Sequence, residues 1–288
     1  MLCTELFAVS PTKATRVLFI FGGAKRMIGV AFGLRGTLVS DGDVEQLAFR
    51  RVATKHANRL HLILDEERLD LAIDRLTRTD GIRRSEFPGA VSRALHVLLG
   101  GNGQIGDLEA DFRRSAAALV ADVVQPLPDT RETLAQLASL GIPRAILTND
   151  MSSVAKREAE LIGFDGPLLI AEDIDAWKPD RAAFDLLAAT LGLQPARIWF
   201  VGVNLERDVD AAREAGFQTI WLDRDGAGNR AHLTEPGTTV SALTDIPAIF
   251  AEHYTRSLLG LRYVYHNALE WRPGHFVPGV EYGLDVEQ

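Results

Sequence analysis

Four short apolar runs in the second half of the chain decide its fold: RAILT at residues 144–148, LLI at 168–170, IWFV at 198–201 and TIWL at 219–222. Segments with the apolar spacing of helices stand between them, at 154–162, 181–191 and 208–215, and each ends at a glycine. Strands that alternate with helices of about ten residues predict crossover connections and a parallel sheet. We therefore expect an α/β, Rossmann-like three-layer sandwich, with GVAF at 29–32 as its first strand.

Acidic residues stand where two of the helices near the sheet are predicted to begin. Asp129 and Glu132 form a capping-box pattern before the apolar positions of 134–140, and Asp180 precedes the helix at 181–191. We expect the side chains of Asp129 and Asp180 to accept hydrogen bonds from the first backbone N–H groups of these helices.

The segment between the first strand and the rest of the sheet has a different pattern. Helical spacing recurs in it and strand patterns do not, which predicts helices at Val44–Leu62, Asp65–Leu76, Ala90–Leu99 and Leu108–Val123. The expected domains are an N-terminal extension (1–26), a core (27–40 and 126–250), an inserted helical domain (41–125) and an aromatic-rich C-terminal extension (251–288). Met27 is an alternative translation start. The C-terminal extension holds all four tyrosines and is expected to pack on the protein itself, on a protein partner or on a ligand.

Composition narrows the classes of protein. The 288 residues carry 31 Lys and Arg against 39 Asp and Glu, a formal net charge of −8, which argues against a nucleic-acid or anionic-membrane surface. The single cysteine, Cys3, allows no intrachain disulfide, and Val17–Phe21 is too short an apolar run for a membrane span. We expect a soluble, cytoplasmic protein with no nucleic-acid or membrane partner.

One glycine motif resembles a dinucleotide-binding site, but we do not expect it to bind a dinucleotide. Gly101-Asn-Gly-Gln-Ile-Gly106 matches the dinucleotide fingerprint G-x-G-x-x-G, which functions only between a strand and a helix. The segment before it is predicted to be helical, so we expect a helix–helix loop, with Asp107 as the cap of the following helix.

Four segments, in order, resemble the motifs of the haloacid-dehalogenase-like superfamily. Its D-x-D-G-T motif corresponds to Gly33-Leu-Arg35-Gly-Thr37, its Thr or Ser at a strand end to Thr148-Asn149, its Lys before a helix to Lys178, and its G-D-x-x-x-x-D motif to Gly202-Val203 through Asp208. The resemblance covers about residues 27–250 and implies that the inserted helices are the family's cap.

The resemblance also implies a chemistry that this chain has lost in part. In the family, the first Asp is the nucleophile, the second is the general acid and base, and carboxylates of the first and fourth motifs hold magnesium. The corresponding residues here are Gly33, Arg35 and Val203, which are degenerate catalytic positions, and Asp208 is the one retained metal-ligand position. We expect no catalytic residue of the family's kind, and no cofactor unless the chain is a hydrolase after all, in which case magnesium is expected.

The remaining motif residues predict an anion site. Arg35, Thr148, Asn149 and Lys178 are the candidate residues for binding a phosphate or carboxylate. The alternative for Arg35 is a closed salt bridge with Asp208 that replaces the metal structurally.

Three functions therefore compete. The first is a pseudoenzyme that binds a small anionic ligand or a protein partner, and the second is an enzyme rebuilt for a metal-independent reaction in the cleft between cap and core. The third is a phosphohydrolase with an unrecognised nucleophile. Asp41 and Asp43 are expected to lie too far away to replace the missing carboxylates, and the Thr37 hydroxyl has no evident base.

Overall fold

The computed structural model describes residues 28–77, 87–226 and 238–250. The predicted N-terminal extension (1–26) and the predicted C-terminal extension (251–288) both lie outside these ranges. By its contacts the chain divides into two units, Met1–Pro247 and Ala248–Gln288, and the fold described here is that of the first.

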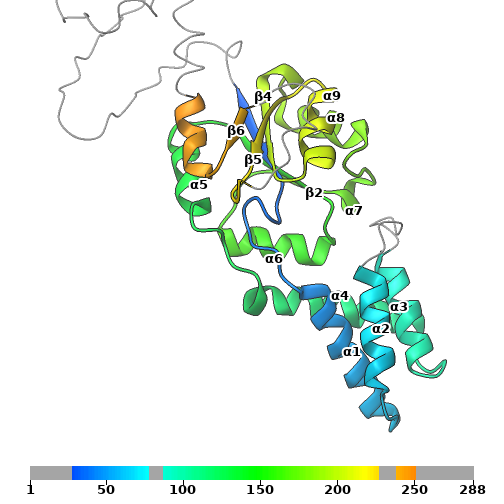
Figure 1. Ribbon diagram of the computed structural model, residues 1–288. Coiled ribbons are helices and arrows are strands. Elements are labelled where there is room, and N and C mark those ends of the chain that lie inside the picture. Colours follow the sequence, from blue (N-terminus) through cyan, green and yellow to red (C-terminus); the bar gives the residue numbers. More distant parts are fainter. Residues whose placement is uncertain (1–27, 78–86, 227–237, 251–288) are drawn as a thin grey trace, which may run out of the picture. The chain divides into compact units, whose positions relative to one another are not determined.

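Within the described residues, six parallel strands form one sheet in the order β3-β2-β1-β4-β5-β6 (Figure 1). Their bounds are Gly29–Phe32 (β1), Arg144–Thr148 (β2), Leu168–Ile170 (β3), Ile198–Gly202 (β4), Gln218–Leu222 (β5) and Thr238–Val240 (β6). From β1 the chain proceeds outward to β2 and β3 and then returns to place β4 on the other side of β1. This reversal opens a crevice beyond the carboxyl end of β1, which is where open α/β sheets bind ligands.

Helices cover both faces of the sheet, and the predicted three-layer sandwich is confirmed. Figure 1 shows α5 (Thr130–Ser139) on one side and α8 (Arg181–Leu191) and α9 (Ala211–Glu214) on the other. Phe184 of α8 is fully buried and packs edge-on against Phe200 of β4 and Phe217, with ring centroids 5.3 and 5.7 Å apart. Gly192 ends α8 with φ 65°, the left-handed conformation predicted at a helix stop.

The inserted segment is helical, as predicted. It comprises α1 (Val44–Leu60), α2 (Glu66–Thr77), α3 (Phe87–Leu98) and α4 (Ile105–Val123). The G-x-G-x-x-G segment connects α3 to α4, so the prediction of a helix–helix loop is confirmed. The predicted cap at Asp107 is wrong, because α4 begins earlier, with Gln104 at its N-cap, and Asp107 lies within the first turn.

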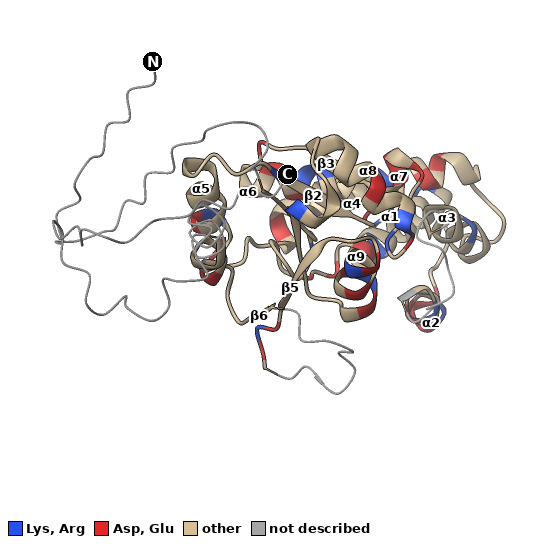
Figure 2. Ribbon diagram, turned by 90° about the horizontal axis from the view of Figure 1, so that it is seen from above, with Lys and Arg blue, Asp and Glu red and all other residues tan. Residues whose placement is uncertain are grey.

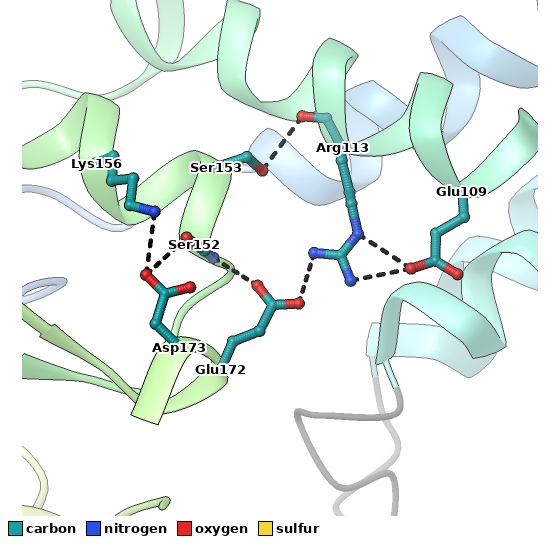
Figure 3. Close-up of polar contacts among 7 residues, drawn as sticks. All are labelled: Glu109, Arg113, Ser152, Ser153, Lys156, Glu172 and Asp173. Carbon is teal, nitrogen blue, oxygen red and sulfur yellow. Dashed lines mark hydrogen bonds and ion pairs between the residues drawn. The ribbon is translucent and has the colours of Figure 1, made fainter. Parts of the chain in front are cut away.

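A polar cluster joins α4 to two helices of the sheet region, α6 (Ser152–Ile162) and α7 (Ala171–Ile174) (Figure 3). The Arg113 guanidinium of α4 lies 2.6 Å from Glu172 of α7 and also donates to Glu109 on its own helix. Glu172 in turn accepts the backbone N–H of Ser152 at the start of α6, where a negative charge is favoured by the helix dipole. Arg113 thus links the inserted helical segment to the helices that flank the sheet.

Several short elements were not predicted, among them two 3₁₀ turns, η3 (Pro195–Arg197) and η6 (Leu243–Asp245). β6 and α7 are only three and four residues long, and a π-helical turn, η4 (Leu205–Asp210), occupies the start of the helix predicted at 208–215. The predicted side-chain caps are also absent: Asp180 makes no capping hydrogen bond. Asp129 makes none either and instead accepts from Arg224, 2.8 Å away, and from the backbone N–H of Leu243.

Charge on the described helices is mixed in sign. Figure 2 shows basic and acidic segments interspersed, with α2 and α9 each carrying both. Within the described ranges, none of the helices is both long and apolar enough to cross a membrane.

Candidate ligand-binding site

A polar cavity of about 330 Å³ lies at the carboxyl ends of the central strands. Most of the residues singled out from the sequence line it: Gly33, Arg35, Thr148, Asn149, Lys178, Val203 and Asp208. Five further residues complete the lining: Leu34, Asp41, Asp150, Asn204 and Arg207. The parallel topology brings these segments together, because β1, β2 and β4 are neighbours whose carboxyl ends share one edge of the sheet.

Lys178 and Asp208 form a buried ion pair at the base of this cavity. The Lys178 ammonium lies 2.6 Å from Asp208 Oδ1, and the two side chains are only 5% and 3% exposed. Asn149 fixes the lysine backbone from both sides, since its amide donates to the Lys178 carbonyl and its oxygen accepts the Lys178 N–H. The second Asp208 oxygen accepts the backbone N–H of Asn204. A buried charge pair needs such additional bonds to offset its desolvation.

Arg35 does not pair with Asp208, so the predicted Arg35–Asp208 salt bridge is wrong. Its Nε donates to Glu158 Oε1 of α6 at 2.7 Å, and its Nη1 lies 2.8 Å from Glu45 Oε1 of α1. Asp150, which follows β2, lies 3.8 Å from Nε. Arg35 is thus held by three carboxylates, and one of them belongs to the helical block.

These carboxylates and the arginine shift each other's pKa. Burial alone would lower the pKa of Arg35, but the charges of Asp150, Glu45 and Glu158 outweigh it and raise the pKa above its usual value. Burial raises the pKa of Glu158 to about 7, with a smaller contribution of the same sign from Asp150. The positive charge of Arg35 lowers the pKa of Glu158, but by less than burial raises it.

Thr148 is occupied as well. Its hydroxyl donates to the carboxylate of Asp150, two residues further on, and accepts the backbone N–H of the same residue. Both residues are buried. The hydroxyl predicted to bind an anion therefore already has a partner in this arrangement.

Asp41 and Asp43, which follow β1 in the sequence, were both expected to lie too far from the site, and this expectation is wrong for one of them. Asp41 lines the cavity, although its distance along the chain from β1 predicted that it would lie too far away. Asp43 stands at the N-cap of α1 and is not among the lining residues. Sequence reasoning also missed Arg207, a lining residue on the π-helical turn η4, because its position depends on that turn.

The residues at the magnesium position of the resemblance do not fit that ion. Gly33 and Val203 supply no side-chain oxygen, and one oxygen of Asp208 is taken by the Lys178 ammonium. A cation already bound at 2.6 Å opposes a second cation at the same carboxylate. Among residues 28–77, 87–226 and 238–250, no group of three or more His, Cys, Asp or Glu side chains is arranged to hold a metal ion.

The fold and the ordered motifs define a haloacid-dehalogenase type of architecture, and the chain belongs to the haloacid dehalogenase-like hydrolase family, whose model matches residues 29–216. It is 28% identical over 204 residues to (S)-2-haloacid dehalogenase from Pseudomonas fluorescens, covering 69% of this chain and 86% of that protein. To (S)-2-haloacid dehalogenase 4A from Burkholderia cepacia it is 29% identical over 133 residues, 45% of this chain. The matched region spans 57% of that relative's length.

A solved structure shows the same fold. The crystal structure of 2-haloacid dehalogenase from Pseudomonas syringae pv. Tomato DC3000 aligns with a TM-score of 0.61 and 22% identity, over 79% of this chain and 100% of that one. At this identity the likeness concerns the fold alone, since one fold serves many chemistries. The predicted family is confirmed.

Proposed function

We propose that this chain is a non-hydrolytic member of its family that binds a small anionic ligand in the cavity at the carboxyl ends of β1, β2 and β4. One observation carries the proposal. Position 33, where the family resemblance puts the nucleophile, is glycine, and the adjacent Lys178 is paired with Asp208. Without the nucleophile, enzymes of this style lose on the order of a millionfold in rate.

Unpartnered donors support an anion as the ligand. Arg35 and Arg207 line the cavity, and each keeps a buried guanidinium nitrogen that has no hydrogen-bond partner within the described residues. Leaving a buried donor unpaired costs about 1–3 kcal/mol, and a ligand rich in oxygen acceptors would offset that cost if these guanidinium groups turn toward the cavity when it binds. Guanidinium groups bind carboxylates and phosphates through two parallel hydrogen bonds.

The first test asks whether the family chemistry is absent. The protein is assayed against a panel of phosphate esters and 2-chloropropionate, with and without magnesium, beside the triple variant Gly33→Asp/Arg35→Asp/Val203→Asp. No turnover by the natural chain supports the proposal, and activity in the variant supports it further. Magnesium-dependent turnover that is lost on Asp41→Asn or Asp150→Asn would instead establish a hydrolase with a displaced nucleophile, because both aspartates line the cavity.

The second test asks whether an anion binds. Titration calorimetry with inorganic phosphate and with acetate, in the presence of EDTA, should detect binding of at least one of them. Arg207→Gln should weaken it about tenfold, the effect of losing one charged hydrogen bond. The control is Arg197→Gln, an exposed arginine on the 3₁₀ turn before β4 that is not among the lining residues. Absence of binding to both anions would contradict the proposal.

One observation favours a second function, a rebuilt enzyme. Glu158, whose pKa is raised to about 7, accepts a hydrogen bond from Arg35, and Arg35 lines the cavity. A carboxyl group with such a pKa suits proton transfer near neutral pH. Mass spectrometry of the bound ligand after incubation distinguishes the two functions. A product whose formation stops in Glu158→Gln supports the enzyme, and an unchanged ligand supports binding alone.

A further inference from the structure

Arg35 connects the cavity to a carboxylate that lies outside it. The arginine lines the cavity, and its Nε donates at 2.7 Å to Glu158 Oε1 on α6. The Glu158 side chain is fully buried and is not among the residues that line the cavity. Any charge that a ligand brings beside Arg35 therefore acts on Glu158 across a single guanidinium group.

Negative charge is crowded around this arginine. Glu158 and Glu45 lie 2.7 and 2.8 Å from two of its nitrogens, and Asp150 lies 3.8 Å from Nε. A guanidinium carries one positive charge, so three ionised carboxylates leave an excess of negative charge in a poorly solvated place. Burial and neighbouring negative charges both favour the protonated form of a carboxyl group.

Glu158 is the member of this group on which a proton is best placed. Its Oε2 is buried and has no hydrogen-bond partner within the described residues, so the ionised form receives no donor there. The side chain of Glu45 is 22% exposed and can be hydrated, and Asp150 accepts the Thr148 hydroxyl. The pKa of Glu158, which burial raises to about 7, agrees with this assignment.

Other charged groups on α6 and on the helices packed against it pair elsewhere. They are Lys156 with Asp173, Arg157 with Glu160, Arg113 of α4 with Glu109 and Glu172, and Arg131 of α5 with the Leu161 carbonyl. Within the described residues, the charged groups that act most strongly on Glu158 are thus Arg35, Asp150 and Glu45.

An anion in the cavity adds a further negative charge beside Arg35. It needs no contact with Glu158, because charges in a poorly solvated interior interact over several ångströms and are little screened by salt. The added charge makes the ionised form of Glu158 less stable than the protonated form. Binding of the anion and binding of the proton then strengthen each other by the same factor, as linkage requires.

We infer that the cavity binds its anion together with a proton on Glu158, so that anion affinity is high in mildly acidic solution and falls as the pH rises above neutrality. Below neutral pH Glu158 already carries the proton, and the affinity changes little with pH. Above neutral pH the proton has to be taken up from solution when the anion binds, and the affinity falls. This inference rests on the proposed anion-binding function and adds its regulation by pH.

The test uses the full chain in EDTA, with acetate and inorganic phosphate as probes. Calorimetry at about pH 7.5 in Tris and in HEPES, which differ in their heats of ionisation, gives the number of protons taken up per bound anion. The natural protein should take up at least about 0.3 proton more than Glu158→Gln, which has no proton to gain at this position. Phosphate exchanges a proton of its own with both chains, so this difference isolates Glu158. The control, Glu160→Gln, changes a side chain of α6 that is 64% exposed and should match the natural protein.

Affinity gives a second readout of the same coupling. Between pH 6 and pH 8 the anion affinity should fall about five- to tenfold more in the natural protein than in Glu158→Gln. Glu45→Gln leaves Glu158 in place and removes one carboxylate from Arg35 at a partly exposed position. The anion affinity of this variant at pH 8 should rise at least about threefold, because less negative charge opposes the ligand.

The outcomes separate this inference from the proposed function. Protons reach buried groups through local opening of the structure, so equilibrium measurements suit the test. Equal proton uptake and equal pH dependence in the natural protein and Glu158→Gln would overturn the inference and leave the proposed function standing. An anion affinity that is unchanged in Glu45→Gln would also overturn it. No binding of either anion at any pH would contradict both.

Discussion

Replacing Glu158 by glutamine should change how the stability of the protein depends on pH. The Glu158 side chain is fully buried in α6, with one oxygen bonded to Arg35 and the other without a partner within the described residues. Asp150 and Glu45 add negative charge beside it. Glu158→Gln keeps an oxygen acceptor for Arg35 and removes the group that titrates.

The size and sign follow from linkage. Burial raises the pKa of Glu158 from its ordinary 4.5 to about 7 in the folded protein. Between these values the folded chain keeps a proton that the unfolded chain loses, so stability falls as the pH rises. The difference corresponds to about 3–4 kcal/mol at about 1.4 kcal/mol per pKa unit. Relative to Glu158→Gln, the natural protein should lose this amount between about pH 4.5 and pH 7.5.

Urea unfolding at a series of pH values from 5 to 8 measures the effect. The quantity of interest is the difference in unfolding free energy between the natural protein and Glu158→Gln at each pH. Glu160→Gln is the control, because Glu160 lies on the same helix with its side chain 64% exposed. A pH dependence of this difference no larger than that of the control would refute the reasoning.

Three further changes test the packing of the site. Lys178→Met should cost about 3–5 kcal/mol in urea unfolding, because it leaves the buried Asp208 without its partner. Gly202→Ala should lower the melting temperature by several degrees or more, since its Cβ would fall 2.4 Å from Asp208 Cβ. Arg113→Gln should cost no more than about 1 kcal/mol, because its pair with Glu172 is partly exposed.

Each of these changes has its own control. The double variant Lys178→Met/Asp208→Asn should be more stable than Lys178→Met alone, and the reverse order would contradict the assigned ion pair. A melting temperature for Gly202→Ala equal to that of the natural protein would contradict the predicted clash, because it would show that Asp208 on η4 can shift away from residue 202. For Arg113, a double-mutant cycle with Glu172→Gln isolates the pair, and a coupling energy well above 1 kcal/mol would contradict the estimate.

The sequence was sufficient to predict the strands that lie at the centre of the sheet. Runs such as RAILT and IWFV are short, apolar and bounded by turn residues, and central strands are buried on both faces. β6 was not predicted, because its residues, Thr238–Val240, are mostly polar and lie at the edge of the sheet. Edge strands carry a weaker apolar signal, and three residues are too few to show a period.

The sequence predicted only part of the lining of the site, without Asp150, Asn204 and Arg207, and it did not predict the pairing. Motif order and parallel topology place Arg35, Thr148 and Lys178 around one cavity. The partners of Arg35 could not be predicted in the same way, because Glu158 lies 123 residues away on another element. Which carboxylate Arg35 contacts depends on how α1 and α6 pack. The spacing of residues along the sequence does not predict that packing.

The Lys178–Asp208 pair also bears on how such a sequence can change over generations. An aspartate restored at position 33 alone would begin 3.8 Å from Lys178 Nζ and would share that ammonium with Asp208. Arg35, permanently charged and held by Glu158 and Glu45, would still supply neither acid nor base. An aspartate nucleophile working with an acid–base group would therefore need substitutions at positions 33 and 35 together, and either substitution alone would leave that pair of roles incomplete.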